Sequence, residues 1–172
     1  MIIKSKRFTL RPYRKGDEHS LVDNINDWNI YKYTCNIPHP YTIKIAKWWI
    51  NKNLKLFKSK NTNEVNFAID VDGKVVGGIG FKDISPKHKA EIGYWIGKKY
   101  RNIGLITEAV RVVTDFGFSK LKFRRIYATV FPANKSSARV LEKNKYILEG
   151  KMRNYTKKDG NFIDIFLYSK SK

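Results

Sequence analysis

Hydrophobic and polar residues alternate most clearly over 90–96, where the chain reads AEIGYWI. Every second position is apolar, which is the period of a β-strand with one buried face. Over 106–116 the apolar residues instead recur at intervals of three and four, the period of an amphipathic helix. Glu108 falls in the first turn of that helix, where the helix dipole stabilises a carboxylate. The pattern therefore predicts a strand and a helix joined by the short basic loop 98–104.

The same two periods divide the remainder of the chain into further elements. Alternation predicts strands at 7–13, 66–71, 75–84, 124–131, 146–155 and 162–168. Helical spacing predicts a helix from Asp17 through Trp28, a second from its cap Thr42 through Phe57, and a third over 136–144 after the cap Asn134. In the second helix the apolar residues fall on or near one face, which is expected to be the core side: Ile45, Ala46, Trp49, Ile50, Leu54 and Phe57. Asp72-Gly73 and Asp159-Gly160 are typical of hairpin turns. The prolines at 38 and 40 predict a loop across the aromatic stretch 28–42.

The order of these elements is β-α-α-β-β-β-α-β-α-β-β, which predicts a mixed α/β (α+β) fold with about four helices. The 172 residues are enough for one domain with its own core, and no linker or repeat divides them. We therefore expect a single domain over 1–172. Gly77, Gly78 and Gly80 within one predicted strand indicate a bulge or the close approach of another backbone.

The formal net charge is +20, from 35 Lys and Arg against 15 Asp and Glu. Such a field attracts nucleic acid, ribosomes, anionic membranes or a polyanionic cofactor, although a general bias toward lysine would produce the same count. A single cysteine, Cys35, excludes an internal disulfide and favours a reducing, cytoplasmic location. No apolar run is long enough for a membrane span. The three histidines lack the spacing of metal ligands, so we expect no metal.

The loop 98–104 has the properties of an anion site. The first backbone N–H groups of the following helix have no partner within the helix and can bind phosphate. Gly104 permits a left-handed backbone, and Lys98, Lys99 and Arg101 add positive charge. An ordinary turn with solvated lysines is the competing interpretation of the same residues.

This segment resembles the acetyl-CoA-binding motif of the GNAT superfamily of N-acetyltransferases. The family loop usually reads Gln/Arg-x-x-Gly-x-Gly/Ala, and here Lys99 stands for Gln/Arg and Asn102 for the first glycine, with Gly104 last. Lys99 keeps a positive charge, and asparagine tolerates the left-handed region better than most residues. The loop shape is therefore expected to survive both replacements.

Further motifs follow the same family in order, closest to its branch of Rim-type ribosomal-protein N-terminal acetyltransferases. They read LRPY, IPHPYT, AEIGYWIG, GLITEAV, NKSSARVLEKNKY and EGKMRNYTKKDGNFIDIFLYS. Lys145-Tyr146 replaces the usual Gly-Phe. The resemblance implies a twisted, mostly antiparallel sheet that splays open between the strand ending at Ile96 and the strand 126–131.

The resemblance also implies where acetyl-CoA binds. The pantetheine arm would enter the splay, and the pyrophosphate would meet backbone N–H groups of Arg101, Asn102, Ile103, Gly104, Leu105 and Ile106. Lys99 belongs to the same loop, and the N–H near Ile96 would stabilise the oxyanion. Asn134 would flank the thioester, and Arg139 would lie near the 3′-phosphate. A solvated cation on the helix surface is an equally good interpretation of Arg139.

Direct attack of an amine on the thioester needs a base, an oxyanion donor and an acid. Glu91 is the first candidate for the base and Asp164 the second, but a structural ion pair is the more common fate of either. A base reached through water, or no base, is also compatible with the family. Ser137 is the candidate acid because Leu141 occupies the position of the usual tyrosine, and a plain packing role for Ser137 is the alternative.

The acceptor is expected between the first two helices and the last hairpin, with Trp28, Tyr31, Tyr33, Tyr41 and Trp49 as candidates for its wall or for core positions. The leading hypothesis is an N-acetyltransferase acting on a protein N-terminus, possibly of a ribosomal protein. A small-molecule amine such as an amino sugar or amino acid is an alternative, and the positive charge disfavours a polyamine. A weakly catalytic domain that binds RNA or ribosomes is a third hypothesis. Monomer and dimer both remain open.

Overall fold

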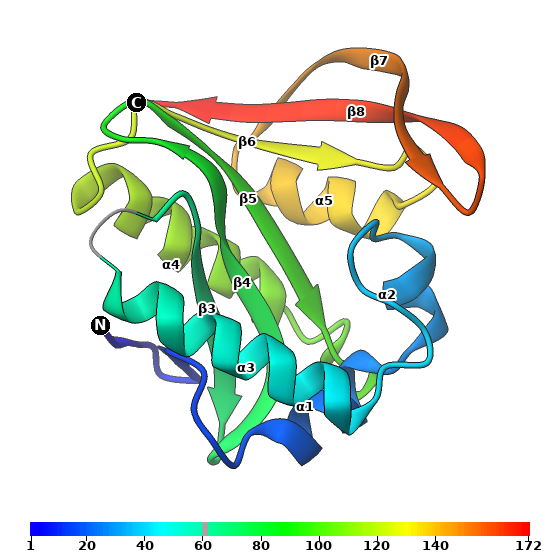
Figure 1. Cartoon of the computed structure of the whole chain (residues 1–172). Helices are drawn as coiled ribbons and strands as arrows, with labels where there is room; N and C mark the ends of the chain where they lie inside the picture. The colour runs from blue at the N-terminus through cyan, green and yellow to red at the C-terminus, as the bar shows by residue number, and fades with distance from the viewer. Residues whose placement is uncertain (60–61) are drawn as a thin grey trace.

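A computed structural model describes residues 1–59 and 62–172 of the protein. It contains one eight-stranded sheet (Figure 1). The strand order is β1-β2-β3-β4-β5-β6-β8-β7. The strands are β1 (Ile3–Lys4), β2 (Thr9–Arg11), β3 (Val65–Val71), β4 (Lys74–Ser85), β5 (Lys89–Ile96), β6 (Arg125–Val130), β7 (Ile147–Lys158) and β8 (Asn161–Ser171). Within the described residues every neighbouring pair is antiparallel except β5 and β6.

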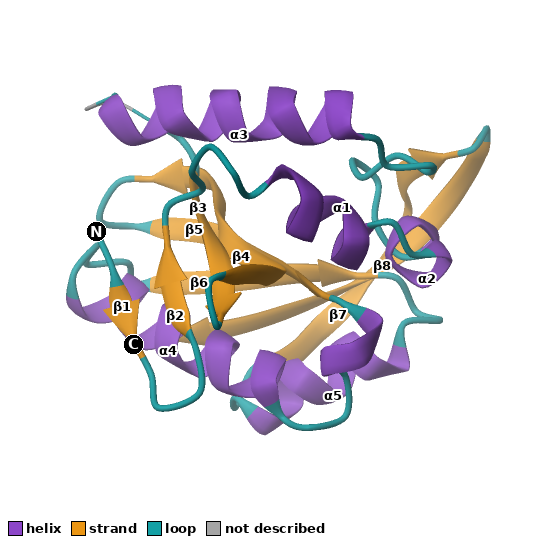
Figure 2. Cartoon of the chain, turned by 90° about the horizontal axis from the view of Figure 1, so that it is seen from below, coloured by secondary structure: helices purple, strands orange, loops and turns teal. Residues whose placement is uncertain are grey.

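Helices cover both faces of this sheet. They are α1 (Glu18–Ile25), α2 (Trp28–Lys32), α3 (Ile43–Lys58), α4 (Leu105–Ser119) and α5 (Lys135–Lys143), with a 3₁₀ turn at Lys98–Tyr100. Figure 2 shows α1 and α3 on one face and α4 and α5 on the other. The predicted mixed α/β fold is confirmed. None of the helices in the described ranges is long and apolar enough to cross a bilayer.

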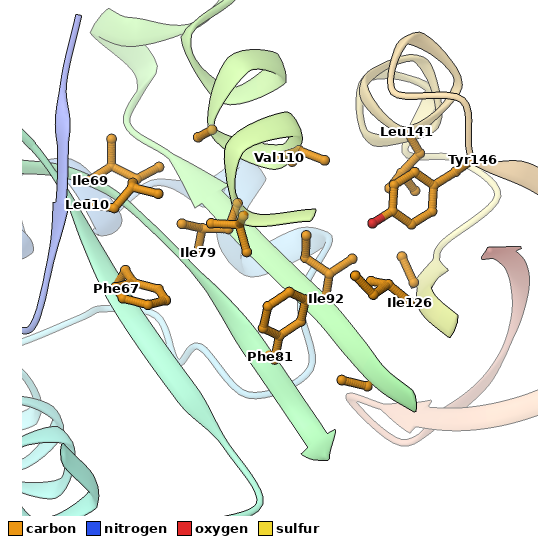
Figure 3. Packing of buried hydrophobic residues seen from close by; sticks show 14 of the residues in the cluster. Leu10, Phe67, Ile69, Ile79, Phe81, Ile92, Val110, Ile126, Leu141 and Tyr146 are labelled. Atoms are coloured by element: carbon orange, nitrogen blue, oxygen red, sulfur yellow. The ribbon is translucent and has the colours of Figure 1, made fainter. Parts of the chain in front are cut away.

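The larger core lies between the sheet and the helices α4 and α5. Figure 3 shows Leu10, Ile69 and Ile126 of the sheet facing Val110 of α4 and Leu141 of α5, all of them fully buried. Burial of one such aliphatic side chain contributes roughly 2 kcal/mol. A second core under α1 and α3 contains Ala46 and Ile50 of α3. The sheet is therefore packed against helices on both of its faces.

The predicted turns and caps form as their residue types indicate. Asp72 and Gly73 have φ of 51° and 81°. Asp159 and Gly160 have similar values, 49° and 82°, so both hairpins turn through the left-handed region. Thr42 caps α3 by accepting a hydrogen bond from the Ile45 N–H at 3.4 Å. The glycines of β4 are needed for close approach, since a Cβ on Gly77 would lie 2.7 Å from the Trp95 carbonyl.

Three expectations are wrong. The stretch 28–32, predicted as a loop, forms α2, because the Asp27 carboxylate accepts from the Ile30 N–H at 3.1 Å and caps a new helix. The first helix therefore ends at Ile25 and does not reach Trp28. Phe57, predicted on the core side of the second helix, is 55% exposed at the end of α3. The first two errors share one cause, the cap at Asp27, and the third concerns only the side of α3 on which Phe57 lies.

Candidate active site

The parallel pair β5 and β6 separates after a short contact. Their paired residues are Lys89 to Glu91 on β5 and Arg125 to Tyr127 on β6. Beyond them β5 stays paired with β4 as far as Ile96, while β6 stays paired with β8. Figure 1 shows the two strands diverging toward α2 and α5. The facing edges of the two strands are consequently available to an extended ligand, which can pair with them as an added strand does.

The loop at the open end of β5 turns through two left-handed residues. Asn102 has φ of 63° and Gly104 of 78°, so the expected tolerance of Asn102 for this region is confirmed. Gly104 is the N-cap of α4, and no side chain caps the helix there. The first N–H groups of α4 are thus left to bind an anion, as the orphan donors of a helix N-terminus can.

Two arginines hold this loop from either side. Arg7 Nη2 donates to the Ile103 carbonyl at 2.8 Å and its Nη1 lies 3.6 Å from Glu108 Oε2. Arg101 donates from Nε to the Ile96 carbonyl at 3.3 Å. Leu105 is buried beneath the loop, whereas Lys99 and Ile103 are exposed. Ile106 is half-buried against the main core.

Arg101 also joins the loop to the acceptor side of the molecule. Its Nη2 lies 2.8 Å from Asp27 Oδ1, the same carboxylate oxygen that caps α2. Burial alone would raise the pKa of Asp27, but the hydrogen bonds from Arg101 and from the Ile30 N–H outweigh it and lower the pKa. The Arg101 side chain is thereby committed to a carboxylate, so a phosphate at this loop depends chiefly on the backbone N–H groups.

The N-terminus of α5 lies across the gap from this loop. Asn134 caps α5 as predicted, accepting from the Ser137 N–H at 3.2 Å. The Ser137 hydroxyl is 2.9 Å from the Tyr94 hydroxyl of β5. Burial raises the pKa of Tyr94, and the hydrogen bond with Ser137 lowers it by less. Arg139 is exposed on the outer side of α5. Two hydroxyl groups, one of them from Tyr94, therefore meet where sequence reasoning had placed Ser137 alone.

Glu91 is buried on β5, with 6% of its surface exposed. Its carboxylate accepts from the Thr129 hydroxyl at 2.6 Å and lies 3.3 Å from Lys82 Nζ. Since side chains alternate along a strand, Glu91 points away from the face on which Tyr94 meets Ser137. The structure therefore places the two candidate catalytic groups on opposite faces of β5.

The distance along β5 separates Glu91 from the expected oxyanion donor. Ile96 lies five residues further on, about 16 Å at 3.3 Å per residue. Direct contact of one acetyl group with both the Glu91 carboxylate and the Ile96 N–H is excluded at that separation. The second candidate base, Asp164, lies 2.8 Å from Lys151 Nζ, and this contact lowers its pKa.

The aromatic segment after α1 contacts the tip of the β7–β8 hairpin. The Tyr31 hydroxyl donates to Asp159 Oδ1 at 2.7 Å, and Lys158 Nζ lies 3.7 Å from the centre of the Tyr31 ring. Trp28 and His39 pack on Tyr31 with ring centres 5.1 and 5.9 Å away. The expected neighbourhood of this segment and the last hairpin is therefore present.

The five candidate wall residues differ in exposure. Trp28 is 60% exposed, Tyr31 and Tyr33 are half-buried, and Tyr41 is 5% exposed within the second core. Burial raises the pKa of Tyr41 to about 12. Trp49, the fifth candidate, packs edge-on against Tyr13 in the same core. Trp28 and Tyr31 are thus accessible to an acceptor, whereas Tyr41 has the environment of a core residue.

A family model described as an acetyltransferase (GNAT) domain matches residues 7–147. The chain belongs to the GNAT family. Among curated relatives of this GNAT protein, the uncharacterized N-acetyltransferase YoaA of Bacillus subtilis (strain 168) is 38% identical over 169 residues, 98% of this chain and 95% of YoaA. The ribosomal-protein-serine acetyltransferase of Escherichia coli (strain K12) is 29% identical over 105 residues, 60% of this chain and 59% of that protein.

Solved structures agree with this assignment. An acetyltransferase (GNAT family) from Bacillus anthracis has a TM-score of 0.86 at 28% identity, covering 99% of this GNAT protein and 98% of that chain. Structures with the same fold have been solved with coenzyme A and with acetyl-CoA. The predicted family and the predicted class of enzyme, an acyltransferase, are both confirmed.

Sequence reasoning missed several residues that hold the site of this GNAT protein together. Arg7 and Asp27 contact a loop that lies 96 and 74 residues away in the sequence, and no local pattern links them. Thr129 and Lys82 reach Glu91 from neighbouring strands. Of these residues, only Asp27 could have been predicted from the sequence, since an aspartate before WNIY is a plausible helix cap. No cluster of His, Cys, Asp and Glu suited to a metal is present among residues 1–59 and 62–172.

Proposed function

We propose that this GNAT protein, acting as one domain over 1–172, transfers the acetyl group of acetyl-CoA to the N-terminal amine of a protein. Binding of acetyl-CoA is supported by the N-terminus of α4, which no side chain caps. Two left-handed residues precede this helix, and it lies at the open end of the gap between the parallel strands β5 and β6. A pyrophosphate fits such donors, because they are unpaired and lie at the positive end of the helix dipole.

The donor set of the protein matches acetyl-CoA along its length. The backbone N–H groups of 101–106 would bind the pyrophosphate, with Lys99 adding charge. The free edges of β5 and β6 would pair with the pantetheine amides, as an added strand pairs with a sheet edge. Arg139 on α5 would meet the 3′-phosphate, and Asn134 would flank the thioester. When bound, acetyl-CoA supplies an activated acyl group whose carbon an amine attacks directly.

The two faces of β5 would divide the proton transfers. Attack forms the C–N bond and breaks the C–S bond, so one proton leaves the amine and one reaches the sulfur. Glu91 would take the amine proton through a chain of several waters along β5, because its carboxylate lies too far from a group held at Ile96 for direct contact or for a single bridging water. The Ser137 hydroxyl, paired with that of Tyr94, would donate to the sulfur from the opposite face. A backbone N–H of β5 near Ile96 would stabilise the oxyanion.

A protein N-terminus is favoured over other amines by two observations. The E. coli relative is named for acetylation of a ribosomal protein. The exposed Trp28 and the half-buried Tyr31 offer the flat apolar contact that a peptide end needs. The protein as a whole carries a net charge of +20, which repels a polycation. A small-molecule amine such as an amino sugar or amino acid is the second candidate.

Calorimetric titration with acetyl-CoA, followed by an acceptor screen, tests the proposal. We expect one-to-one binding that Asn102→Asp weakens at least tenfold, since the new carboxylate repels the pyrophosphate. Asn63→Asp adds the same charge at an exposed residue far from the loop and should change the affinity little. Mass spectrometry of peptide and amino-sugar mixtures then identifies the acceptor. Binding that both variants leave unchanged would exclude the loop, and acetylation of small amines alone would exclude the protein acceptor.

A further inference from the structure

The outer face of α3 carries a row of exposed cations. Lys44, Lys47, Lys55 and Lys58 are all exposed, and so are Trp48 and Asn51 between them. At 100° per residue these six positions fall within one sector of about 100°. Figure 2 shows α3 as the outermost element on its face of the sheet. We call these six residues the α3 stripe, which is about 21 Å long at 1.5 Å per residue.

Within residues 1–59 and 62–172, the four lysines of the α3 stripe lack an acidic partner. The helix 43–58 contains five lysines and no Asp or Glu. Of these, Lys52 is paired, with its Nζ 2.6 Å from Glu64 Oε1. No ion pair joins the other four to a carboxylate in the part of the chain that the structure describes. Like charges at this spacing repel each other along the helix, and a bound polyanion would remove that repulsion.

Trp48 adds an aromatic surface to the middle of this stripe. It is 61% exposed, although burial of an indole is strongly favourable. Lys52 Nζ lies 5.9 Å from its ring centre, and the Trp49 ring packs against it at 6.4 Å. The indole is therefore supported from within the helix while its outer surface stays open. An aromatic ring among cations is the combination on which unpaired bases stack.

We propose that the α3 stripe binds single-stranded RNA, with the lysines on the phosphates and Trp48 stacked on a base. Charge complementarity favours a polyanion, and the exposed indole favours an unpaired base over a duplex. A membrane surface fits less well, because the apolar side of α3 is already used: Ala46 and Ile50 are 0% and 1% exposed against the sheet.

The position of the stripe connects RNA to the acceptor side of the enzyme. The helix α3 begins directly after Tyr41 and Thr42, which end the aromatic segment beside the β7–β8 hairpin. RNA on α3 would therefore run beside the acceptor side, which would recruit the enzyme to an amine in a ribonucleoprotein. The RNA contact itself does not depend on acetyl transfer, so the two proposals can fail separately.

Fluorescence anisotropy with a labelled oligouridine, measured over a range of salt concentrations, tests the stripe. The variant Lys44→Gln/Lys47→Gln/Lys55→Gln/Lys58→Gln should bind at least tenfold more weakly. Its slope of log K against log salt should fall by up to about 3, since each phosphate contact on a single strand contributes about 0.7. The matched control Lys15→Gln/Lys74→Gln/Lys89→Gln/Lys120→Gln removes the same charge from exposed positions elsewhere and should change both quantities much less.

Trp48→Ala separates stacking from charge. It should weaken RNA binding by about 5- to 100-fold with an unchanged salt slope, because stacking on one base is worth that much and carries no charge. Acetyl-CoA affinity should stay the same in all three variants, which also shows that they are folded. Equal losses in the stripe and control variants would overturn the proposal in favour of diffuse attraction. Binding to anionic vesicles without binding to RNA would overturn it in favour of a membrane.

Discussion

The cofactor side and the acceptor side of this enzyme are built in different ways. The cofactor loop uses backbone geometry that its own residues specify, with Asn102 and Gly104 left-handed before an uncapped helix. The acceptor side uses side chains from segments far apart, such as Tyr31 and Asp159, which are 128 residues apart. A site made of backbone N–H groups keeps its donors when side chains are replaced. A site made of side chains changes its contacts with each replacement. We therefore expect cofactor binding to be robust and acceptor choice to be easily altered.

Glu91→Gln should have the largest effect on activity. If Glu91 takes the amine proton, kcat falls about 100-fold or more, the usual contribution of a general base. Gln keeps the shape and the hydrogen bond from Thr129. The measurement is steady-state kinetics with saturating acetyl-CoA, which separates a loss of kcat from a change in KM. Asp164→Asn is the control on the acceptor side, and a kcat within twofold of the wild type in Glu91→Gln would assign Glu91 a structural role.

A pair of glycine replacements compares the two sides directly. Gly104 and Gly160 have φ of 78° and 82°, so alanine at either costs about 1 to 2 kcal/mol of backbone strain. Gly104→Ala should weaken acetyl-CoA binding about tenfold, because the strain displaces the phosphate-binding N–H groups. Gly160→Ala should leave that affinity unchanged and raise KM for the acceptor. Calorimetry and kinetics on both variants, with thermal melts, measure this. Equal effects on cofactor affinity would mean that the two sides are not independent.

Asp27→Asn tests the link between the two sides. Asparagine can still cap α2 but cannot form the ion pair with Arg101. A loss of affinity in this variant is therefore caused by the missing ion pair and not by a missing cap. We expect acetyl-CoA affinity to fall about three- to fivefold and acceptor KM to rise together with it. Asp115→Asn removes an exposed pair with Arg111 and is the control, with an effect near zero.

The same pair has a defined pH dependence. The pKa of Asp27 is lowered in the folded protein, so the pair stabilises the fold at pH values above the unfolded pKa of about 4. That contribution is lost as pH falls through the lower folded pKa. The difference in unfolding free energy between wild type and Asp27→Asn should therefore be on the order of 1 kcal/mol at pH 7 and shrink toward pH 3. A difference that does not change with pH would contradict the ion pair.

Tyr31→Phe should have the smallest effect. It removes the hydrogen bond to Asp159 and keeps the ring against which Lys158 packs. A rise in acceptor KM of about two- to threefold is expected, since one exposed hydrogen bond contributes roughly 0.5 kcal/mol or slightly more. Tyr33→Phe serves as the control. An effect on acetyl-CoA affinity instead would place Tyr31 on the cofactor side.

Local patterns predicted much of the fold and the cofactor loop. The meander β3-β4-β5 follows from alternation and from the turn at Asp72-Gly73, and α4 follows from helical spacing after Gly104. The wrong predictions concern segments in which two local sequence patterns favour different structures. Asp27 caps a helix within a stretch that prolines and aromatic residues predict as a loop, and Phe57 is exposed near the end of α3 although its spacing places it with the buried residues.

The sequence by itself determined most of the elements, the left-handed turns and the GNAT motifs, because each depends on residues within a few positions of one another. Only the tertiary structure decided that Glu91 and Ser137 lie on opposite faces of β5 and that Arg101 is committed to Asp27. It also decided that Tyr41 is buried while Trp28 is open. These outcomes depend on how the sheet pairs and on which helices cover it, and the chain reaches them only when segments distant in sequence pack together.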